Sequence, residues 1–168
     1  MLDGGFTCPN RDGRVGQGGC SFCLCESFNP EYCRKHATIT GQLEAGKKFF
    51  EGKYPQMKYL AYFHAYSSTY APLEVLRLRY DEALAVEDVV GLVVATRPDC
   101  IDDDVLALLA SIRERGYSVA IELGCETFYD RTLARVNRGH TSRQSMDAIH
   151  LCHRYAIPVT VHLMFGLP

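Results

Sequence analysis

Apolar residues recur with helical spacing in some segments of the chain and form short continuous runs in others. Helical spacing is found over residues 39–50, 73–84, 102–115, 131–136 and 142–155. Short apolar or aromatic runs, typical of buried strands, occupy residues 58–64, 89–95, 117–123 and 157–165. Because strands alternate with helices, we expect βαβ units around a parallel sheet. The predicted fold class is α/β, either doubly wound or a barrel.

The two ends of the sequence indicate an interrupted fold. Residues 1–5 form a stub before the first cysteine, and Pro168 follows a predicted strand with no helix after it. Parallel strands need crossover connections, which are usually helices. A length of 168 residues suits one domain with a core. We therefore expect residues 1–168 to be one domain, truncated at both ends.

Charge and hydropathy narrow the class of protein. The net charge is −2 and the isoelectric point is near 6.3, so there is no electrostatic footprint for nucleic acid. The N-terminus lacks the basic and apolar regions of a signal peptide. No apolar run reaches the roughly 20 residues that a membrane span needs. We expect a reduced, cytoplasmic protein with no membrane partner.

Three cysteines near the start carry the main chemical signal. Cys8, Cys20 and Cys23 lie in the Gly-rich segment CPNRDGRVGQGGCSFC, and Cys25 follows closely. This crowding argues against a disulfide framework. A structural zinc site takes four ligands. A 4Fe-4S cluster bound by three thiolates instead leaves one iron open, so the loop indicates chemistry.

Two other interpretations of the sequence remain open. A zinc-stabilised, non-catalytic module would use Cys20 and Cys23 with two of Cys25, Cys33 and His36. Otherwise Cys25 and Cys33 are free buried thiols, or Cys25 competes with Cys23 for iron. A metal-free barrel lyase or aldolase is the other interpretation. It would need a reactive lysine or carboxylate at a strand end, but lysines 47, 48, 53 and 58 fall in helical or loop segments.

Seven motifs occur in order along the chain: GFTCPNRDG, GGCSFC, AYSSTYAPLE, ATRPD, ELGCET, NRGHT and HLMFGLP. Together they closely resemble the radical SAM (S-adenosylmethionine) superfamily. More narrowly, they are similar to its YhcC-like branch, which is related to the Elongator catalytic subunit. The resemblance implies a partial (β/α)6 TIM-like barrel with the cysteine loop after strand one. Compared with the family, most of strand one and all of strand six are missing.

The resemblance implies a set of cofactor contacts. Cys8, Cys20 and Cys23 match the cluster ligands, although the common spacing C-x3-C-x2-C is lengthened here, as is typical of the branch. Phe22 is implied to lie against the SAM adenine; the alternative is an ordinary loop aromatic. SAM is implied to chelate the open iron through its amine and carboxylate. An electron from the cluster then cleaves SAM to a 5′-deoxyadenosyl radical.

Further residues match SAM contacts of relatives. Arg138 is implied to bind the SAM carboxylate, the alternative being a solvated arginine at a helix end. Glu126 stands where relatives usually have a glutamine that contacts the ribose. Ser67 and Ser68 stand, as a loose match, where the superfamily binds the SAM amine.

Several polar residues have no fixed role in this comparison. Glu122, inside a predicted strand, is either paired or functional, because an unpaired buried carboxylate is costly. Arg97 and Asp99 either pair with each other or face the active site. His64 and His162 lie in strands and are candidates to point into the pocket, whereas we expect histidines 36, 150 and 153 on the surface.

The function implied is that of a radical SAM enzyme with an unidentified substrate. Kinship with Elongator-like enzymes points by analogy to the wobble uridine of tRNA. Such an enzyme also needs an electron donor such as flavodoxin or ferredoxin. We expect the 168-residue chain itself to be inactive, because SAM would be poorly enclosed without strand six.

Overall fold

Four parallel strands form the centre of the computed structural model, which describes residues 1–24, 29–51 and 56–168. The strands lie side by side in chain order and are β1 (Tyr59–Phe63), β2 (Val89–Thr96), β3 (Ser118–Glu126) and β4 (Val159–Leu163). They lie where the apolar runs predicted them. The α/β class with a parallel sheet is therefore confirmed.

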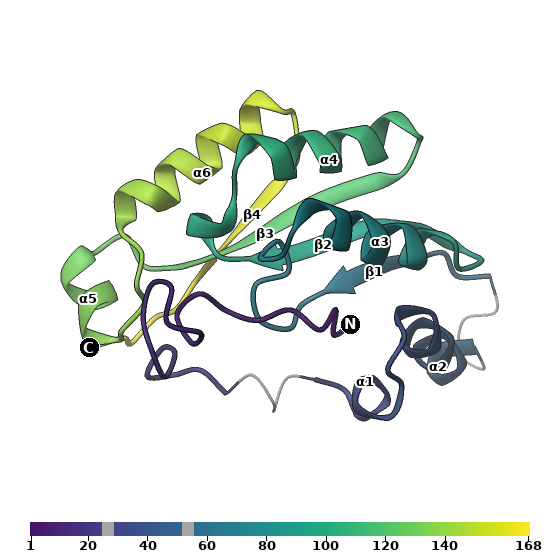
Figure 1. Ribbon diagram of the computed structural model, residues 1–168, viewed down its shortest axis with the longest axis horizontal. Helices are drawn as coiled ribbons and strands as arrows, with labels where there is room; N and C mark the ends of the chain where they lie inside the picture. Colours follow the sequence, from purple (N-terminus) through teal and green to yellow (C-terminus); the bar gives the residue numbers. More distant parts are fainter. Residues whose placement is uncertain (25–28, 52–55) are drawn as a thin grey trace.

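The helices follow the strands and are α1 (Glu31–Lys35), α2 (Ile39–Glu51), α3 (Leu73–Leu84), the 3-10 turn η2 (Pro98–Cys100), α4 (Asp103–Glu114), α5 (Asp130–Arg135) and α6 (Ser142–Arg154). Figure 1 shows α3, α4 and α6 on the same side of the sheet, where they contact β2, β3 and β4. The longer helices lie where their spacing predicted them, and α1 and η2 are additional. Among the described residues, none of the helices has the length and apolar character needed to cross a membrane.

The N-terminal segment extends the sheet beyond β1. Leu2 forms a parallel bridge with Phe63, and its N–H donates to Tyr62 O at 2.7 Å. The His64 N–H in turn donates to Leu2 O at 3.3 Å. The first residues therefore take the place of an adjoining strand, as expected for the partial barrel. The segment then crosses to the end of the sheet near α5 (Figure 1).

The alternation along β3 decides which residues enter the core and which face a pocket. The buried set packs with the helix-covered core and comprises Val119, Ile121, Leu123 and Cys125. The intervening residues Glu122, Gly124 and Glu126 line a pocket on the opposite face. The helices thus cover one face of the sheet and leave the other face for chemistry.

Gly91 marks the closest approach of β2 to β3. A Cβ atom at this position would lie 2.1 Å from the backbone oxygen of Ser118, which cannot move aside without distorting β3. We expect Gly91→Ala to lower the free energy of unfolding by about 2 kcal/mol, measured by urea denaturation. The exposed neighbour Val90 provides the control, since Val90→Ala should change it by less than about 1 kcal/mol. Equal urea midpoints for the two variants would contradict the close approach.

Candidate functional site

The cysteine loop folds back on itself between residues 8 and 23. The N–H groups of Arg11 and Asp12 donate to Cys8 O, and Gly19 N–H donates to Asn10 O at 2.9 Å. The chain returns through Gly18 and Gly19, whose φ angles of 77° and 81° are readily adopted by glycine. This turn carries Cys20 and Cys23 back toward Cys8.

The NRGHT motif holds the loop in place from the other end of the chain. Asn10 Nδ2 donates to Asn137 O at 2.5 Å, and Asn137 Nδ2 donates to Gly19 O at 2.8 Å. Ser21 N–H donates to Val136 O at 3.0 Å. The loop is therefore fixed to the segment that carries Arg138, directly before α6.

The three cysteines of the loop meet the strand ends at one pocket of ≈160 Å³. Its lining residues are Cys8, Gly19, Cys20, Cys23, His64, Tyr66, Ser67, Ala95, Thr96, Arg97, Glu122, Gly124, Glu126, Arg138 and His162. Six of the residues predicted as cofactor or metal contacts are in this set. The structure thus brings together segments that lie more than a hundred residues apart in the sequence.

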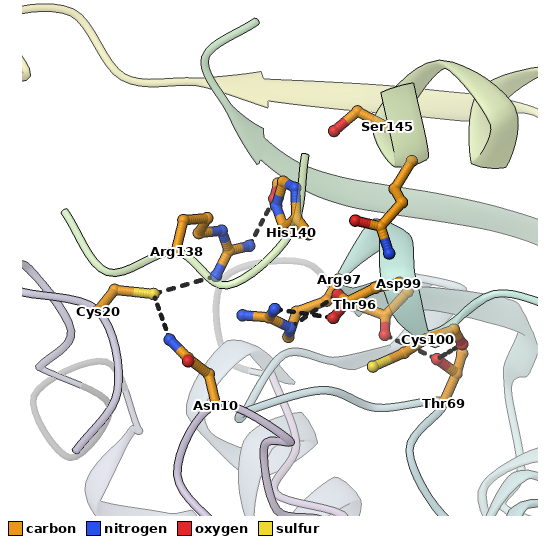
Figure 2. Close-up of polar contacts among 12 residues, drawn as sticks. Asn10, Cys20, Thr69, Thr96, Arg97, Asp99, Cys100, Arg138, His140 and Ser145 are labelled. Atoms are coloured by element: carbon orange, nitrogen blue, oxygen red, sulfur yellow. Dashed lines mark hydrogen bonds and ion pairs between the residues drawn. The ribbon is translucent and has the colours of Figure 1, made fainter. Parts of the chain in front are cut away.

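Cys20 lies at the centre of a hydrogen-bonded cluster (Figure 2). Its Sγ is 3.6 Å from Asn10 Nδ2 and 3.4 Å from Arg138 Nη1, and all three residues are buried. Two N–H donors directed at one sulfur suit a metal-bound thiolate, whose sulfur accepts such bonds. These contacts fix the position of the Cys20 thiol at the pocket wall.

A cluster and a single metal ion place different demands on the three thiols. Within the described ranges, no three His, Cys, Asp or Glu side chains converge closely enough to hold one metal ion. A cubane places each thiolate on a different iron, so its ligands need only surround a common space. Cys8, Cys20 and Cys23 do so by lining the same pocket.

Cys33, the other described cysteine considered with the loop, does not line the pocket. Cys33 is a buried free thiol whose Sγ donates to Met1 O at 3.4 Å, and burial raises its pKa. Cys33 and His36 line a different hollow, beside Asp3. The zinc interpretation therefore lacks two of its proposed ligands, and Cys25 lies outside the described residues.

Arg138 and Glu126 form a largely buried ion pair at the rim of the pocket. Arg138 Nη2 is 3.3 Å from Glu126 Oε1 and also donates to Gly124 O. Burial raises the pKa of Glu126, although the nearby Arg138 guanidinium acts in the opposite direction. Arg138 Nε is buried and has no hydrogen-bond partner among the described residues. The alternative of a solvated arginine at a helix end is therefore wrong.

Arg97 and Asp99 form the second buried ion pair. Arg97 Nε and Nη2 each donate to an Asp99 oxygen at 2.9 Å, with side-chain exposures of 3% and 6% (Figure 2). Arg97 also lines the pocket, whereas Asp99 does not. In the part of the chain that the structure describes, Arg97 Nη1 is buried and has no hydrogen-bond partner. The sequence left two alternatives for Arg97, pairing with Asp99 or facing the site. In the structure Arg97 does both.

Two residues predicted to contact SAM lie outside the pocket lining. Ser67 lines the pocket, but Ser68 is fully buried and its hydroxyl donates to Ala65 O. The carbonyl of Ser68 accepts a hydrogen bond from Tyr80 OH at 2.7 Å. Phe22 is half-buried and is not among the lining residues.

A second group of polar residues lines the pocket along β3 and β4. Glu122 Oε2 accepts a hydrogen bond from Tyr62 OH at 2.5 Å and lies 3.0 Å from His162 Nε2. His64 lines the same region, and its ring meets that of Tyr62 edge-on at 5.1 Å. Glu122 is thus paired and also faces the pocket, as do both candidate histidines. The exposed positions of histidines 36, 150 and 153 are as expected.

Sequence reasoning missed Tyr62 and Asn10. Tyr62 lies two residues before His64, so strand alternation could have placed the two rings on the same face. Asn10 gave no such signal, because its partner Asn137 is 127 residues away.

His140 gives the site a pH-dependent stability. It is buried, and burial lowers its pKa to about 4, with the Arg138 charge acting in the same direction. An unfolded histidine titrates near about 6.5, so the unfolded chain binds the extra proton between these two values. The stabilisation is therefore complete above about pH 6.5 and is lost as the pH falls toward 4.

Because of His140, we expect the free energy of unfolding to fall by about 2 kcal/mol when the pH is lowered from about 7.5 to about 5. His140→Gln should remove that part of the pH dependence in urea denaturation at the two pH values. The exposed His150 provides the control, because His150→Gln should leave the slope unchanged. An unchanged slope in His140→Gln would show that His140 protonates freely in the folded protein.

Comparison with known proteins agrees with this arrangement. The sequence matches the radical SAM superfamily over residues 8–168. It is 44% identical over 167 residues to YhcC of Escherichia coli K12, covering 99% of this chain and 53% of YhcC. The chain therefore spans about half the length of that relative.

Two more distant similarities are shorter in extent. The tRNA uridine(34) acetyltransferase of Methanocaldococcus jannaschii is 34% identical over 80 residues, which cover 47% of this chain and 14% of that protein. The structure of Elp3 from Methanocaldococcus infernus superposes with a TM-score of 0.63 at 19% identity, over 77% of this chain and 34% of Elp3, and shows the shared fold. Given the family match along nearly the whole sequence, this chain belongs to the radical SAM superfamily.

Proposed function

We propose that this chain forms the cluster- and SAM-binding part of a radical SAM enzyme. The observation that carries the proposal is that three cysteines of one loop line the same pocket as two buried arginines. In this proposal Cys8, Cys20 and Cys23 bind three irons of a 4Fe-4S cluster, leaving the fourth iron for SAM. Reductive cleavage of SAM to methionine and a 5′-deoxyadenosyl radical is the chemistry that these cofactors supply when bound.

The residues around the thiols would bind and orient SAM. Arg138 provides a fixed cation for the SAM carboxylate, which would compete with Glu126 for the guanidinium. Glu126 is then available to accept hydrogen bonds from the ribose hydroxyls. Ser67 lines the same pocket and would contact the SAM amine. Phe22 and Ser68 would need to shift toward the pocket to contact SAM.

The proposed substrate is the wobble uridine of a tRNA. A relative of this chain is named for uridine 34 of tRNA, which supports the assignment by analogy. The net charge of −2 gives no overall electrostatic attraction to phosphate, so we propose that other parts of the full-length enzyme bind the tRNA backbone. A flavodoxin or ferredoxin would supply the electron, and a reducing cytoplasm would protect the cluster.

Anaerobic reconstitution with iron and sulfide tests the proposal. Electron paramagnetic resonance (EPR) of the reduced protein should show a cubane signal that changes when SAM is added. Bound zinc without an iron chromophore would contradict the proposal. A cluster signal that SAM does not change would restrict this chain to cluster binding and exclude the SAM site.

A further inference from the structure

One polar group in the pocket wall is chemically distinct from the cysteines. It consists of Glu122, His64 and His162, with Tyr62 behind them, and we call it the Glu122 group. Glu122 lies four residues before Glu126 on β3, which corresponds to about 13 Å along a strand. The Glu122 group therefore forms a separate part of the wall of the pocket that the thiols also line.

The space in front of Glu122 is open because of the residue on the neighbouring strand. Ala95 of β2 is paired in register with Glu122, and its small side chain lies between β1 and β3. Tyr62 on β1 reaches across β2 to hydrogen-bond Glu122. This hydrogen bond, with His162 on the other side, fixes the carboxylate in one orientation.

The fixed carboxylate has one oxygen left for a ligand. Tyr62 and His162 both contact Oε2, while Oε1 receives no hydrogen bond from the part of the chain that the structure describes. Burial lowers the pKa of His64, so its ring is neutral at neutral pH. The wall thus combines a carboxylate acceptor with the flat aromatic rings of His64 and Tyr66. It complements a planar ring that carries an N–H donor.

We propose that Glu122 binds the uracil ring of the substrate by accepting a hydrogen bond from its N3–H group. This inference rests on the proposed function, which makes a uridine the substrate. Uracil carries the N3–H donor, whereas cytosine has an acceptor at the same position, so the carboxylate favours uracil over cytosine. Tyr62 acts as a positioning residue, because it holds Glu122 without facing the ring itself.

Binding of uridine and 3-methyluridine to the reconstituted chain tests this contact. The methyl group removes the N3–H donor and leaves the rest of the nucleoside unchanged. We expect the wild-type protein to bind uridine at least about tenfold more tightly in ligand-observed NMR titrations, as for a hydrogen bond to a charged group. Glu122→Ala should bring the ratio of the two dissociation constants to about one. Glu114→Ala, at an exposed position on α4, should keep the wild-type ratio.

A second variant guards against misfolding of Glu122→Ala. Tyr62→Phe keeps the ring but removes the hydroxyl that orients Glu122. We therefore expect a ratio of the two dissociation constants between the wild-type value and one, with an unchanged midpoint of thermal unfolding. The inference would be overturned if the wild type bound the two nucleosides equally or did not bind uridine. It would also be overturned if Glu122→Ala kept the wild-type ratio of the two dissociation constants. A SAM-responsive cluster without uridine discrimination would overturn this inference alone. Discrimination without a SAM response would overturn the proposed radical chemistry and leave the base-binding site.

Discussion

Replacing Cys20 with alanine is expected to abolish the SAM-responsive cluster signal while leaving the fold intact. Cys20 Sγ receives N–H groups from Asn10 and Arg138, which hold this thiol in one position. Two remaining cysteines hold a cubane poorly, and we expect the iron content after reconstitution to fall at least about tenfold. Iron analysis and EPR of the reduced protein with SAM measure this loss.

Cys33 provides the matched control for this experiment. It is a buried free thiol outside the pocket, so Cys33→Ala should keep wild-type iron content and SAM response. The same variant separates the cluster from the zinc knuckle, in which Cys33 is a candidate ligand. A loss of metal in Cys33→Ala, or full retention in Cys20→Ala, would contradict the ligand assignment. Circular dichroism of both variants checks that the fold is retained.

The elements of the fold could be predicted from the sequence because burial on a parallel sheet imposes a simple pattern. The apolar run that became β2 is buried on much of both faces, and the apolar spacing of α4 matches its packed side. Cys8, Cys20 and Cys23 could be placed in one site because they share a loop. Such local patterns need no knowledge of tertiary contacts.

The rest of the site depends on contacts that no local pattern encodes. Tyr66 adopts φ 59°, and after this turn Ser67 lines the pocket while Ser68 packs away from it. The residue types in this motif do not reveal that the two serine side chains point in different directions. Arg97 pairs with Asp99 through the 3-10 turn η2, whose geometry the residue types alone did not predict. Asn10 required knowledge of a contact across 127 residues.

Removal of Asp99 is expected to be the most destabilising change at the pocket. Arg97 is almost fully buried, and both hydrogen bonds of its ion pair go to Asp99. Asp99→Ala would leave the guanidinium buried without a counter-charge, which we expect to cost about 3–5 kcal/mol of unfolding free energy. Burial alone would lower the pKa of Arg97, but Asp99 raises it overall, so the arginine does not escape by losing its proton. Urea denaturation measures the loss.

The surface pair of Arg143 and Asp147 is a control that separates the effect of burial on unfolding free energy from the effect of ion pairing itself. It has the same chemistry, with distances of 3.0 and 3.1 Å, but side-chain exposures of 84% and 57%. Asp147→Ala should therefore cost less than about 0.5 kcal/mol. A similar loss in the two variants would mean that water reaches Arg97 and that its pair is not buried. If the double variant Arg97→Met with Asp99→Ala recovers much of the loss, the unpaired charge is the cause, because the apolar side chain needs no partner. Asp99 would then be the counter-charge that allows Arg97 to be buried in the pocket wall.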